Sequence, residues 1–314
     1  MTEPRLRIGV SSCLLGMNVR YDGGHKEEHF VRHVLAQHVD LIPVCPEIEI
    51  GLGTPREPIQ LEGDPADPRL MTISSRRDLT SAMRSYALRR VEELEAAGLH
   101  GYILKSDSPS CGLSGVKVHR IPYPPVRRGR GVFAAALSSR FPSLPVEEAE
   151  RLRNPAIKEN FIERMFAFYR FQTFLKTRPA ADDLLTFHNN SKMTLLAHSP
   201  AHYERLSLLA ASAGEDFPTT LELYRLLYME ALEIKATRRR HASVLRQLAR
   251  HIARDVDAAD RAEITAAIDN YRRGLVSFAV PLTLLRREFE LHPIDWIVSQ
   301  TYLNPYPAEL ALRG

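Results

Sequence analysis

The chain of 314 residues has no long apolar run, few cysteines and no large excess of one charge. No stretch approaches the roughly 20 apolar residues that a membrane-spanning helix needs, so we expect no membrane association. Residues 1–5 are not followed by the apolar stretch of an export signal. Three cysteines cannot all pair within one chain, which argues against a disulfide scaffold. These absences favour a cytoplasmic protein with reduced thiols.

The charge of the chain is modest but uneven. The formal net charge is +4, and residues 1–150 hold equal numbers of basic and acidic residues. The whole excess therefore lies in residues 151–314. So small an excess is weak evidence for nucleic-acid binding, and the clustering of the basic residues matters more than their number.

The first 140 residues contain short apolar strands that alternate with helices. Their hydrophobic spacing predicts a strand before each cysteine and another at residues 70–73, and helices at residues 26–38, 79–97 and 132–140. This alternation is typical of an α/β domain with a mostly parallel, Rossmann-like sheet that is covered on both faces. Proline and glycine in residues 118–131 predict a basic loop, and residues 141–145 are the predicted linker.

The second half is helical throughout in its hydrophobic pattern. It shows no strand alternation and no internal repeat, which indicates an all-α helical bundle. The periodic stretches are residues 157–175, 184–196, 201–213, 221–254, 259–273 and 281–289. We therefore expect an α/β domain at residues 1–144 and a helical domain at residues 145–314.

Cys13, Cys45 and Cys111 each follow a predicted strand. The carboxyl ends of parallel strands open onto one edge of a sheet, so the three thiols are expected to converge and could form a metal site with one open coordination position. Their spacing identifies no metal, and no histidine lies near them to complete a four-ligand zinc site. Most free cysteines are small buried side chains. The polar residues around these three favour a site instead.

Four segments resemble the thiouracil desulfurase family. They are residues 12–16 (SCLLG), 19–23 (VRYDG), 45–47 (CPE) and 108–112 (SPSCG). The likeness covers about residues 6–140, and the segments occur in the family order. It implies a [4Fe-4S] cluster held by Cys13, Cys45 and Cys111 with one open iron. It also implies an enzyme that removes sulfur from a thiolated pyrimidine without net electron transfer.

Such a reaction needs a group that takes a proton from water and returns it. Glu47, two residues after a cluster ligand, is the first candidate, although it could instead cap a helix or face solvent; Glu49 is a weaker choice. Ser108 is the second catalytic candidate, since it flanks the third cysteine. The candidates for substrate binding are Arg20, Asp22 and Ser110, although residues 21–24 also fit an ordinary turn.

Basic residues cluster in two places. The predicted helix at residues 221–254 carries arginines beside a distinct apolar stripe, and such a row can neutralise phosphates. It could equally be a solvated face paired with Glu230, Glu233 and Asp255. Together with the basic loop, it predicts a nucleic-acid-binding surface. The candidate residues are Arg127, Arg128, Arg130, Arg239, Arg246 and Arg250.

The second half is similar to the YbgA-like helical domain that is often fused to the desulfurase domain. The segments are residues 161–164 (FIER), 187–188 (FH), 196–200 (LAHSP), 280–285 (VPLTLL) and 300–307 (QTYLNPYP). The fusion implies 4-thiouridine as substrate, as a nucleotide or within tRNA. Asn190 stands where the family pattern has a histidine, and we interpret His188 and His198 as structural.

Two other functions stay open at this stage. One is a nucleic-acid-binding protein whose metal site is structural and not catalytic. The other is a sulfur-transfer enzyme that inserts sulfur into RNA. Insertion usually requires nucleotide activation, and the sequence contains no phosphate-binding loop of the Gly-x-x-x-x-Gly-Lys-Ser/Thr type. Sulfur removal is therefore favoured.

Overall fold

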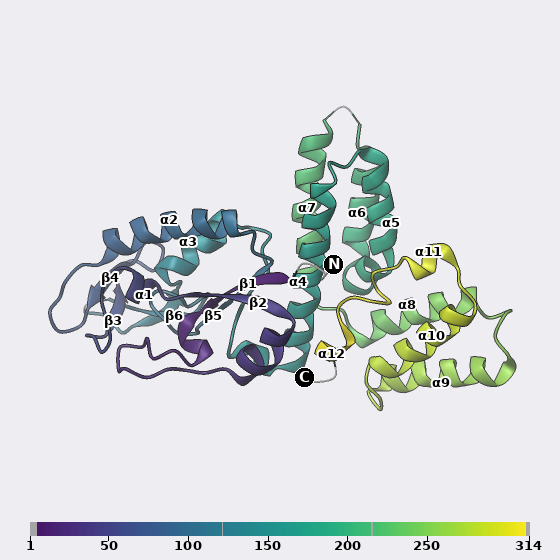
Figure 1. Ribbon diagram of the computed structural model, residues 1–314, viewed down its shortest axis with the longest axis horizontal. Coiled ribbons are helices and arrows are strands. Elements are labelled where there is room, and N and C mark those ends of the chain that lie inside the picture. The colour runs from purple at the N-terminus through teal and green to yellow at the C-terminus, as the bar shows by residue number, and fades with distance from the viewer. Residues whose placement is uncertain (1–4, 121, 215, 312–314) are drawn as a thin grey trace. The chain divides into compact units, whose positions relative to one another are not determined.

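The computed structural model describes residues 5–120, 122–214 and 216–311. The chain forms two compact units (Figure 1). The first comprises Met1–Tyr169 and Ala308–Gly314, and the second comprises Arg170–Pro307. Within the described ranges, no helix is both long and apolar enough to cross a lipid bilayer.

The first unit is built on a parallel sheet of four strands in the order β2-β1-β5-β8. The strands are β1 (Leu6–Ser11), β2 (Val39–Val44), β5 (Gly101–Leu104) and β8 (Val146–Glu148). Ile8 in β1 lies opposite Leu41 on one side and Gly101 on the other. The chain leaves β1 toward β2 and later returns on the opposite side as β5. The switch in direction therefore falls beside β1, where such sheets usually bind ligands.

Helices cover both faces of this sheet, as the sequence predicted. On one face lie α2 (Thr80–Ala97) and α3 (Val132–Arg140) (Figure 1). The ring centroid of Tyr102 in β5 lies 5.8 Å from that of Phe133 in α3. The other face carries the turns η2 (Phe30–Val34) and η3 (Leu35–Gln37) and the start of α4 (Pro155–Lys176). Gly101 lets α4 approach closely, because a Cβ there would lie 2.9 Å from Cγ of Met165.

A second sheet has the strand order β4-β3-β6-β7. Its strands are β3 (Ile59–Glu62), β4 (Arg69–Thr72), β6 (Val116–His119) and β7 (Val126–Gly129). The prediction of a loop at residues 118–131 was therefore wrong, since β6 and β7 pair as antiparallel strands. Prolines 122, 124 and 125 lie between the strands, where they remove no ladder hydrogen bond. Gly129 packs against β6, with its missing Cβ 2.6 Å from Cγ2 of Val118.

Two further expectations for the first unit need correction. The helix predicted at residues 26–38 begins only near Phe30, because the N–H groups of Lys26 and Glu28 bond to the carbonyls of Cys13 and Leu14 instead. The predicted linker at residues 141–145 does not separate two domains, because it joins α3 to strand β8 of the same sheet. The Tyr102 N–H donates to the Pro145 carbonyl at 2.8 Å. The sheet thus continues past residue 144, and the functional division at that residue stays a prediction.

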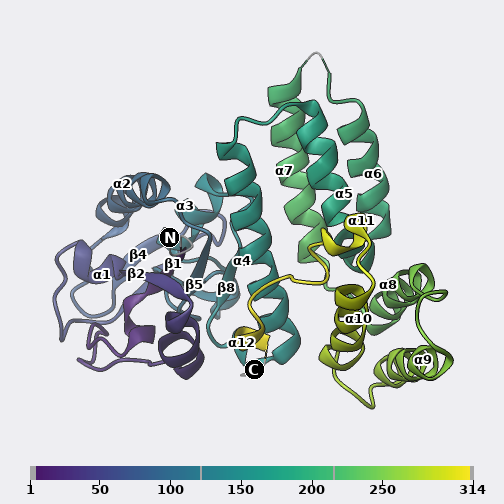
Figure 2. The same ribbon diagram turned by 45° about the vertical axis from the view of Figure 1, so that its right-hand side comes forward.

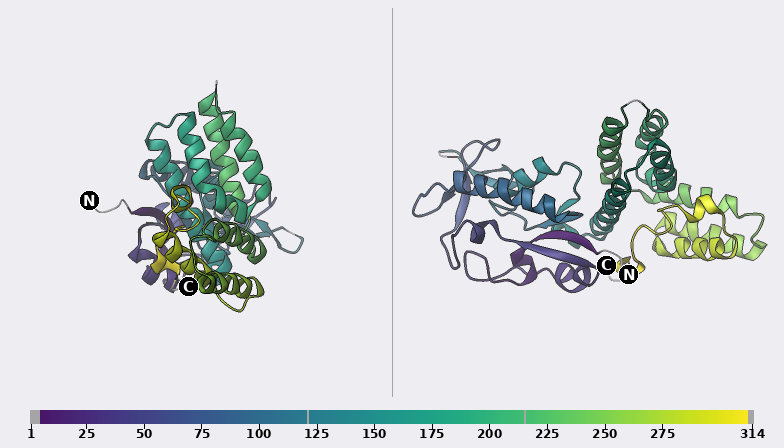
Figure 3. Two further views of the ribbon diagram at one scale, coloured as in Figure 1. Left: turned by 90° about the vertical axis from the view of Figure 1, so that its right-hand side faces the viewer. Right: turned by 45° about the horizontal axis from the view of Figure 1, so that its top comes forward.

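The second unit is helical, as expected. Helices α5 (Ala181–His198), α6 (Pro200–Ala211) and α7 (Phe217–Glu233) run side by side (Figure 2). The other helices are α8 (Arg238–His251), α9 (Ala258–Arg273), α10 (Ala279–Leu291) and the short α11 (Asp295–Val298). Figure 3 shows the green and yellow helices α8 to α10 gathered as a second group within this unit. The last short helix, α12 (Ala308–Ala311), belongs to the first unit.

The prediction of a single helix at residues 221–254 was wrong, because the helical structure is interrupted between α7 and α8. Ile234 is extended, and the Thr237 hydroxyl caps α8 by accepting the Arg240 N–H at 3.2 Å. Buried His198 bonds the Ile234 carbonyl at 2.8 Å, which satisfies a group released at the break. His188 is also buried and bonds Tyr224 Oη at 3.0 Å. Both histidines thus have structural partners.

Candidate active site

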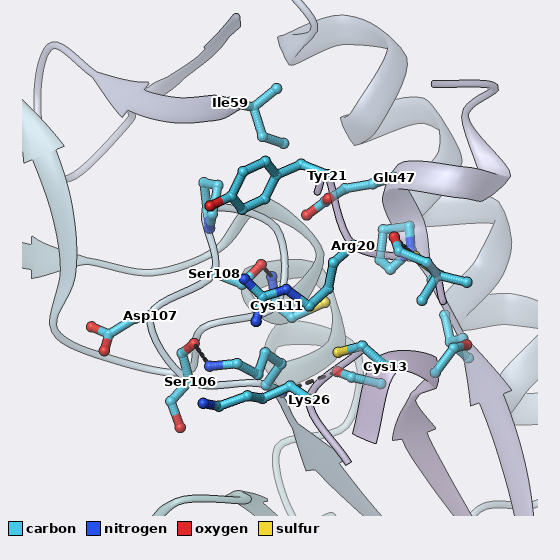
Figure 4. Close-up of a pocket in the computed structure, with 18 of the residues that line it drawn as sticks. Cys13, Arg20, Tyr21, Lys26, Glu47, Ile59, Ser106, Asp107, Ser108 and Cys111 are labelled. Carbon is cyan, nitrogen blue, oxygen red and sulfur yellow. Dashed lines mark hydrogen bonds between the residues drawn. The ribbon is translucent and has the colours of Figure 1, made fainter. Parts of the chain in front are cut away.

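A cavity of about 470 Å³ lies at the carboxyl edge of the parallel sheet and is lined by all three cysteines. Figure 4 shows Cys13 and Cys111 beside Arg20, Ser108 and Glu47 at this cavity. The convergence predicted from strand-end positions is therefore present. Cysteines that are 32 and 66 residues apart in the sequence meet because β1, β2 and β5 are neighbours in one sheet.

Local structure holds each cysteine just beyond its strand. Cys13 lies in the single turn η1 (Ser12–Leu15) directly after β1, and Gly16 ends this turn with a φ of 81°. Cys45 immediately precedes α1 (Pro46–Glu49), whose proline is well suited to the first helical position. Cys111 lies in a loop after β5 that is closed by a 2.8 Å bond from Gly112 N–H to the Ser108 carbonyl.

The Cys111 loop packs tightly on the start of α3. The Phe133 N–H donates to the Ser110 carbonyl at 3.0 Å. A Cβ at Gly131 would lie 2.5 Å from the carbonyl carbon of Ser110 and 2.8 Å from the Cys111 nitrogen. Only glycine fits between the helix and this backbone. Gly131 therefore sets how deeply Cys111 sits.

The surroundings of the thiols favour a cationic ligand. Burial raises the pKa of all three, that of Cys13 to about 11 and that of Cys111 well above its usual range. Because Cys13 and Cys111 are buried and Cys45 is half-buried, binding of a positively charged metal group would stabilise their thiolates. Among the described residues, no three His, Cys, Asp or Glu side chains lie close enough to hold one metal ion. A multi-iron cluster poses a different requirement, because each cysteine binds a separate iron.

Glu47 is held in the cavity wall from two sides. Its Oε1 accepts a hydrogen bond from Ser110 Oγ at 2.6 Å, and its Oε2 pairs with Arg56. Ser108 Oγ lies 3.0 Å from Ser110 Oγ and accepts the N–H of Cys111 at 3.1 Å. Both predicted catalytic residues, Glu47 and Ser108, line the cavity. The structure thus places a carboxylate and two linked hydroxyls beside the third cysteine.

Glu49, the weaker of the two carboxylate candidates, supports the Cys45 segment and does not line the cavity. Its Oε1 accepts the N–H of Cys45 at 2.9 Å, and its Oε2 accepts the hydroxyl of Tyr86 at 2.7 Å. These bonds tie the Cys45 segment to α2. Glu49 is therefore a structural carboxylate.

The substrate-binding candidates differ in position. Arg20 lines the cavity, whereas Asp22 is exposed and does not. Asp22 pairs with Arg20 at 3.1 Å and accepts the Gly24 N–H at 3.0 Å, which fits the turn that the sequence left open. Ser110 is fully buried behind the wall and reaches the cavity through Glu47 and Ser108.

Three cavity cations were missed by the sequence analysis: Lys26, Arg56 and Lys105. Lys105 directly follows β5, so its strand-end position could have indicated it. Its Nζ donates to the Ser106 carbonyl at 2.6 Å and lies 3.4 Å from Glu150. Arg56 lies in an irregular segment after α1, and no local pattern points to it.

The predicted nucleic-acid-binding residues fall into two groups. In β7, Arg127 pairs with Asp107 at 2.7 Å, and Arg130, just after this strand, donates to the Leu113 carbonyl at 3.0 Å. Arg128 is exposed on the same strand. On α8, Arg239 and Arg250 are exposed, and Arg246 pairs with Asp269 of α9. The acid that pairs with Arg246 is therefore not Glu230, Glu233 or Asp255, the three partners considered from the sequence.

Comparison with known proteins finds a matching family model for each half of the chain. A family model described as 2-thiouracil desulfurase matches residues 8–149, and one described as a protein of unknown function (DUF1722) matches residues 192–307. The uncharacterized protein YbbK of Bacillus subtilis (strain 168) is 33% identical over 110 residues, which cover 33% of this chain and 72% of YbbK. The chain therefore belongs to the 2-thiouracil desulfurase family, a family of enzymes.

One further curated protein and one solved structure are also similar to this chain. The uncharacterized protein YbgA of Escherichia coli (strain K12) is 27% identical over 152 residues, covering 48% of this chain and 90% of YbgA. A solved structure named "[4Fe-4S]-dependent thiouracil desulfidase TudS" is 31% identical, covers 49% of this chain and 97% of its own, and superposes with a TM-score of 0.40. The family resemblance, with a YbgA-like second half, is thereby confirmed.

Proposed function

We propose that this enzyme is a [4Fe-4S]-dependent, non-redox desulfurase of 4-thiouracil- or 4-thiouridine-type pyrimidines. The observation that carries the proposal is the convergence of Cys13, Cys45 and Cys111 on one cavity that also contains Glu47. The thiol donors indicate the class of cofactor, and the family indicates the class of substrate. The reaction exchanges thiocarbonyl sulfur for the oxygen of water, so the products are uracil or uridine and hydrosulfide.

The three cysteines fit such a cofactor. Each thiolate would bind one iron, and a fourth iron would have no protein ligand. When bound, the cluster would supply a soft Lewis acid that matches a thiocarbonyl sulfur. Carboxylates are harder donors, and the three that line the cavity, Glu47, Asp107 and Glu150, each lie in an ion pair with a cation.

Glu47 takes the proton of the attacking water and returns it as the product forms. Its carboxylate already accepts one bond from Ser110 and pairs with Arg56, and lone pairs remain for a water in the cavity. Ser108 faces the cavity and is linked to Glu47 through Ser110. Its hydroxyl is placed to contact the substrate. Arg20 lines the same cavity as a further polar contact, with Asp22 acting through it.

We further propose that the thiolated pyrimidine is presented within a nucleotide or tRNA. A groove of about 420 Å³ between α8 and α9 is lined by Arg246, Arg250 and Arg261 above apolar residues such as Ile252 and Ile264. Clustered arginines can neutralise the phosphates of a nucleic-acid backbone. The additional phosphate contacts that we propose are Arg127 and Arg128 of β7, Arg130 just after it, and Arg239 of α8.

The test of the cofactor is the content of iron, zinc and acid-labile sulfide after anaerobic reconstitution. We expect about four irons and four sulfides per chain, and loss of both in Cys13→Ser, Cys45→Ser and Cys111→Ser. Arg69→Ala, which removes an exposed ion pair with Asp78 outside the cavity, is the matched control. Zinc alone, or no metal, would end the desulfurase proposal.

The nucleic-acid part is tested by binding of 4-thiouridine-containing tRNA at several salt concentrations. Arg239→Glu with Arg250→Glu should weaken binding and reduce its salt dependence, since both side chains are exposed. Arg205→Glu places the same charge change on an exposed position of α6 and is the control. Equal affinity in all variants would leave only the small-molecule substrate.

A further inference from the structure

We infer that Arg56 is the positioning residue that aims the Glu47 carboxylate into the cavity. This inference rests on the proposed function, because it assigns Arg56 a task in the same reaction. Arg56 and Glu47 lie nine residues apart, on opposite sides of an irregular segment. Their side chains are 5% and 15% exposed, so the ion pair is shielded from solvent.

Arg56 uses both terminal nitrogens. Nη2 pairs with Glu47, while Nη1 donates to the carbonyls of Val19 at 2.9 Å and Gly53 at 2.8 Å. The guanidinium plane is fixed by these two carbonyls and therefore holds the carboxylate in one orientation. Ser110 holds the other carboxylate oxygen at 2.6 Å. Glu47 is thus clamped on both oxygens.

The other described cations that line the cavity form no ion pair with Glu47. Arg20 pairs with Asp22, and Lys105 bonds the Ser106 carbonyl and lies near Glu150. Arg56 is the one cation in the described ranges that forms an ion pair with Glu47. Removing it would leave a partly buried carboxylate with a single hydroxyl partner, free to rotate about its terminal bond.

The segment that carries Arg56 also has anchors of its own. The backbone N–H of Arg56 donates to the Tyr21 carbonyl at 2.8 Å, and the Thr54 hydroxyl donates to the Arg20 carbonyl at 2.9 Å. These two bonds do not involve the Arg56 side chain, so a variant at this position keeps them.

The experiment measures kcat and KM for 4-thiouracil with Arg56→Ala, Glu47→Gln and the double variant, together with iron and sulfide content. We expect Arg56→Ala to lower kcat about 10- to 100-fold, because a misaligned base loses that much. KM should change by less than about twofold, and iron content should stay at the wild-type level. In the Glu47→Gln background the same substitution should cause no further loss.

Rescue separates positioning from folding. Guanidinium ion added at non-denaturing concentration should restore part of kcat in Arg56→Ala, and Arg56→Lys should retain intermediate activity. Arg69→Ala, an arginine in an exposed ion pair away from the cavity, should behave as wild type. An equal loss in the Glu47→Gln background, or loss of iron in both Arg56→Ala and Arg56→Lys, would overturn the inference.

A second readout does not depend on turnover. Urea unfolding of the metal-free protein for wild type, the two single variants and the double variant measures the Glu47–Arg56 coupling directly. Changes in midpoint that simply add would show that the two side chains do not interact, and would overturn the inference. An inactive, fully loaded wild type would overturn the proposed function while leaving this coupling measurable.

Discussion

The arginines of the two units have different surroundings. In the first unit, Arg56 is 5% exposed and bonds two carbonyls and Glu47 inside a cavity. In the second, the Arg246 side chain is 42% exposed and pairs with Asp269 on a neighbouring helix. Strands that are far apart in sequence meet to form the first site, whereas the second is largely the surface of α8 and its neighbour α9. One region is built to hold atoms in fixed places, and the other to present charge.

The largest effect is expected at the first region. Glu47→Gln keeps the shape of the side chain but removes its ability to take a proton, so kcat should fall by about 10² to 10⁴-fold. Iron and sulfide content should stay unchanged, because the amide can still accept the bond from Ser110. Turnover and iron are measured on one preparation. Full turnover with an intact cluster would show that Glu47 takes no part in the reaction. The contrast between the two regions would then no longer hold.

The second prediction concerns buried His188 in the helical unit. Burial lowers its pKa from an ordinary value near 6.5 to about 4, so on acidification the unfolded chain takes up a proton before the folded one does. Stability contributed by His188 is full above about pH 6.5 and falls toward pH 4 by up to about 1.4 kcal/mol per pH unit.

This dependence is measured by urea unfolding of the helical transition at several pH values. His188→Gln should flatten the stability profile between pH 6.5 and 4, whereas His251→Gln, at an exposed position of α8, should not. A profile that keeps its slope in His188→Gln would show that another group titrates. The loss of stability of the helical unit in acid would then not be caused by His188.

The third prediction tests how rigid the cysteine site is. In Gly131→Ala, the new methyl would collide with backbone atoms of Ser110 and Cys111, which cannot move without shifting the loop. We expect a loss of about 1–3 kcal/mol in unfolding free energy and weaker iron retention. Gly214→Ala is the control, because a Cβ there meets nothing closer than 3.8 Å. Equal stability of the two variants would show that the Cys111 loop adapts.

The smallest effect is expected at the second region. Asp269→Asn removes the partly exposed ion pair with Arg246, and solvent-screened pairs of this kind contribute little to stability. It also leaves Arg246 free at the groove, so affinity for tRNA should rise slightly while stability hardly changes. Thermal unfolding and tRNA binding check this. A large loss of stability would mean that α8 and α9 depend on the pair, and the contrast with Arg56 would weaken.

The strand-end positions of the three cysteines could be predicted from the sequence, because strand periodicity and strand ends are local properties. The sequence also predicted α2, α3 and most helices of the second unit, and the short segments around Cys13, Cys45 and Cys111 identified the family. Glu47 could be named in advance for the same reason, since it follows Cys45 by two residues.

Contacts between distant segments were decided only by the tertiary structure. No local pattern shows that Arg56 reaches Glu47, that Gly131 lies against the Ser110 carbonyl, or that His198 satisfies the Ile234 carbonyl at the break between α7 and α8. The pairing of β6 with β7 likewise depends on partners across a turn. Hydrophobic periodicity reports which face of an element is buried, but the partner on that face is chosen by the whole fold.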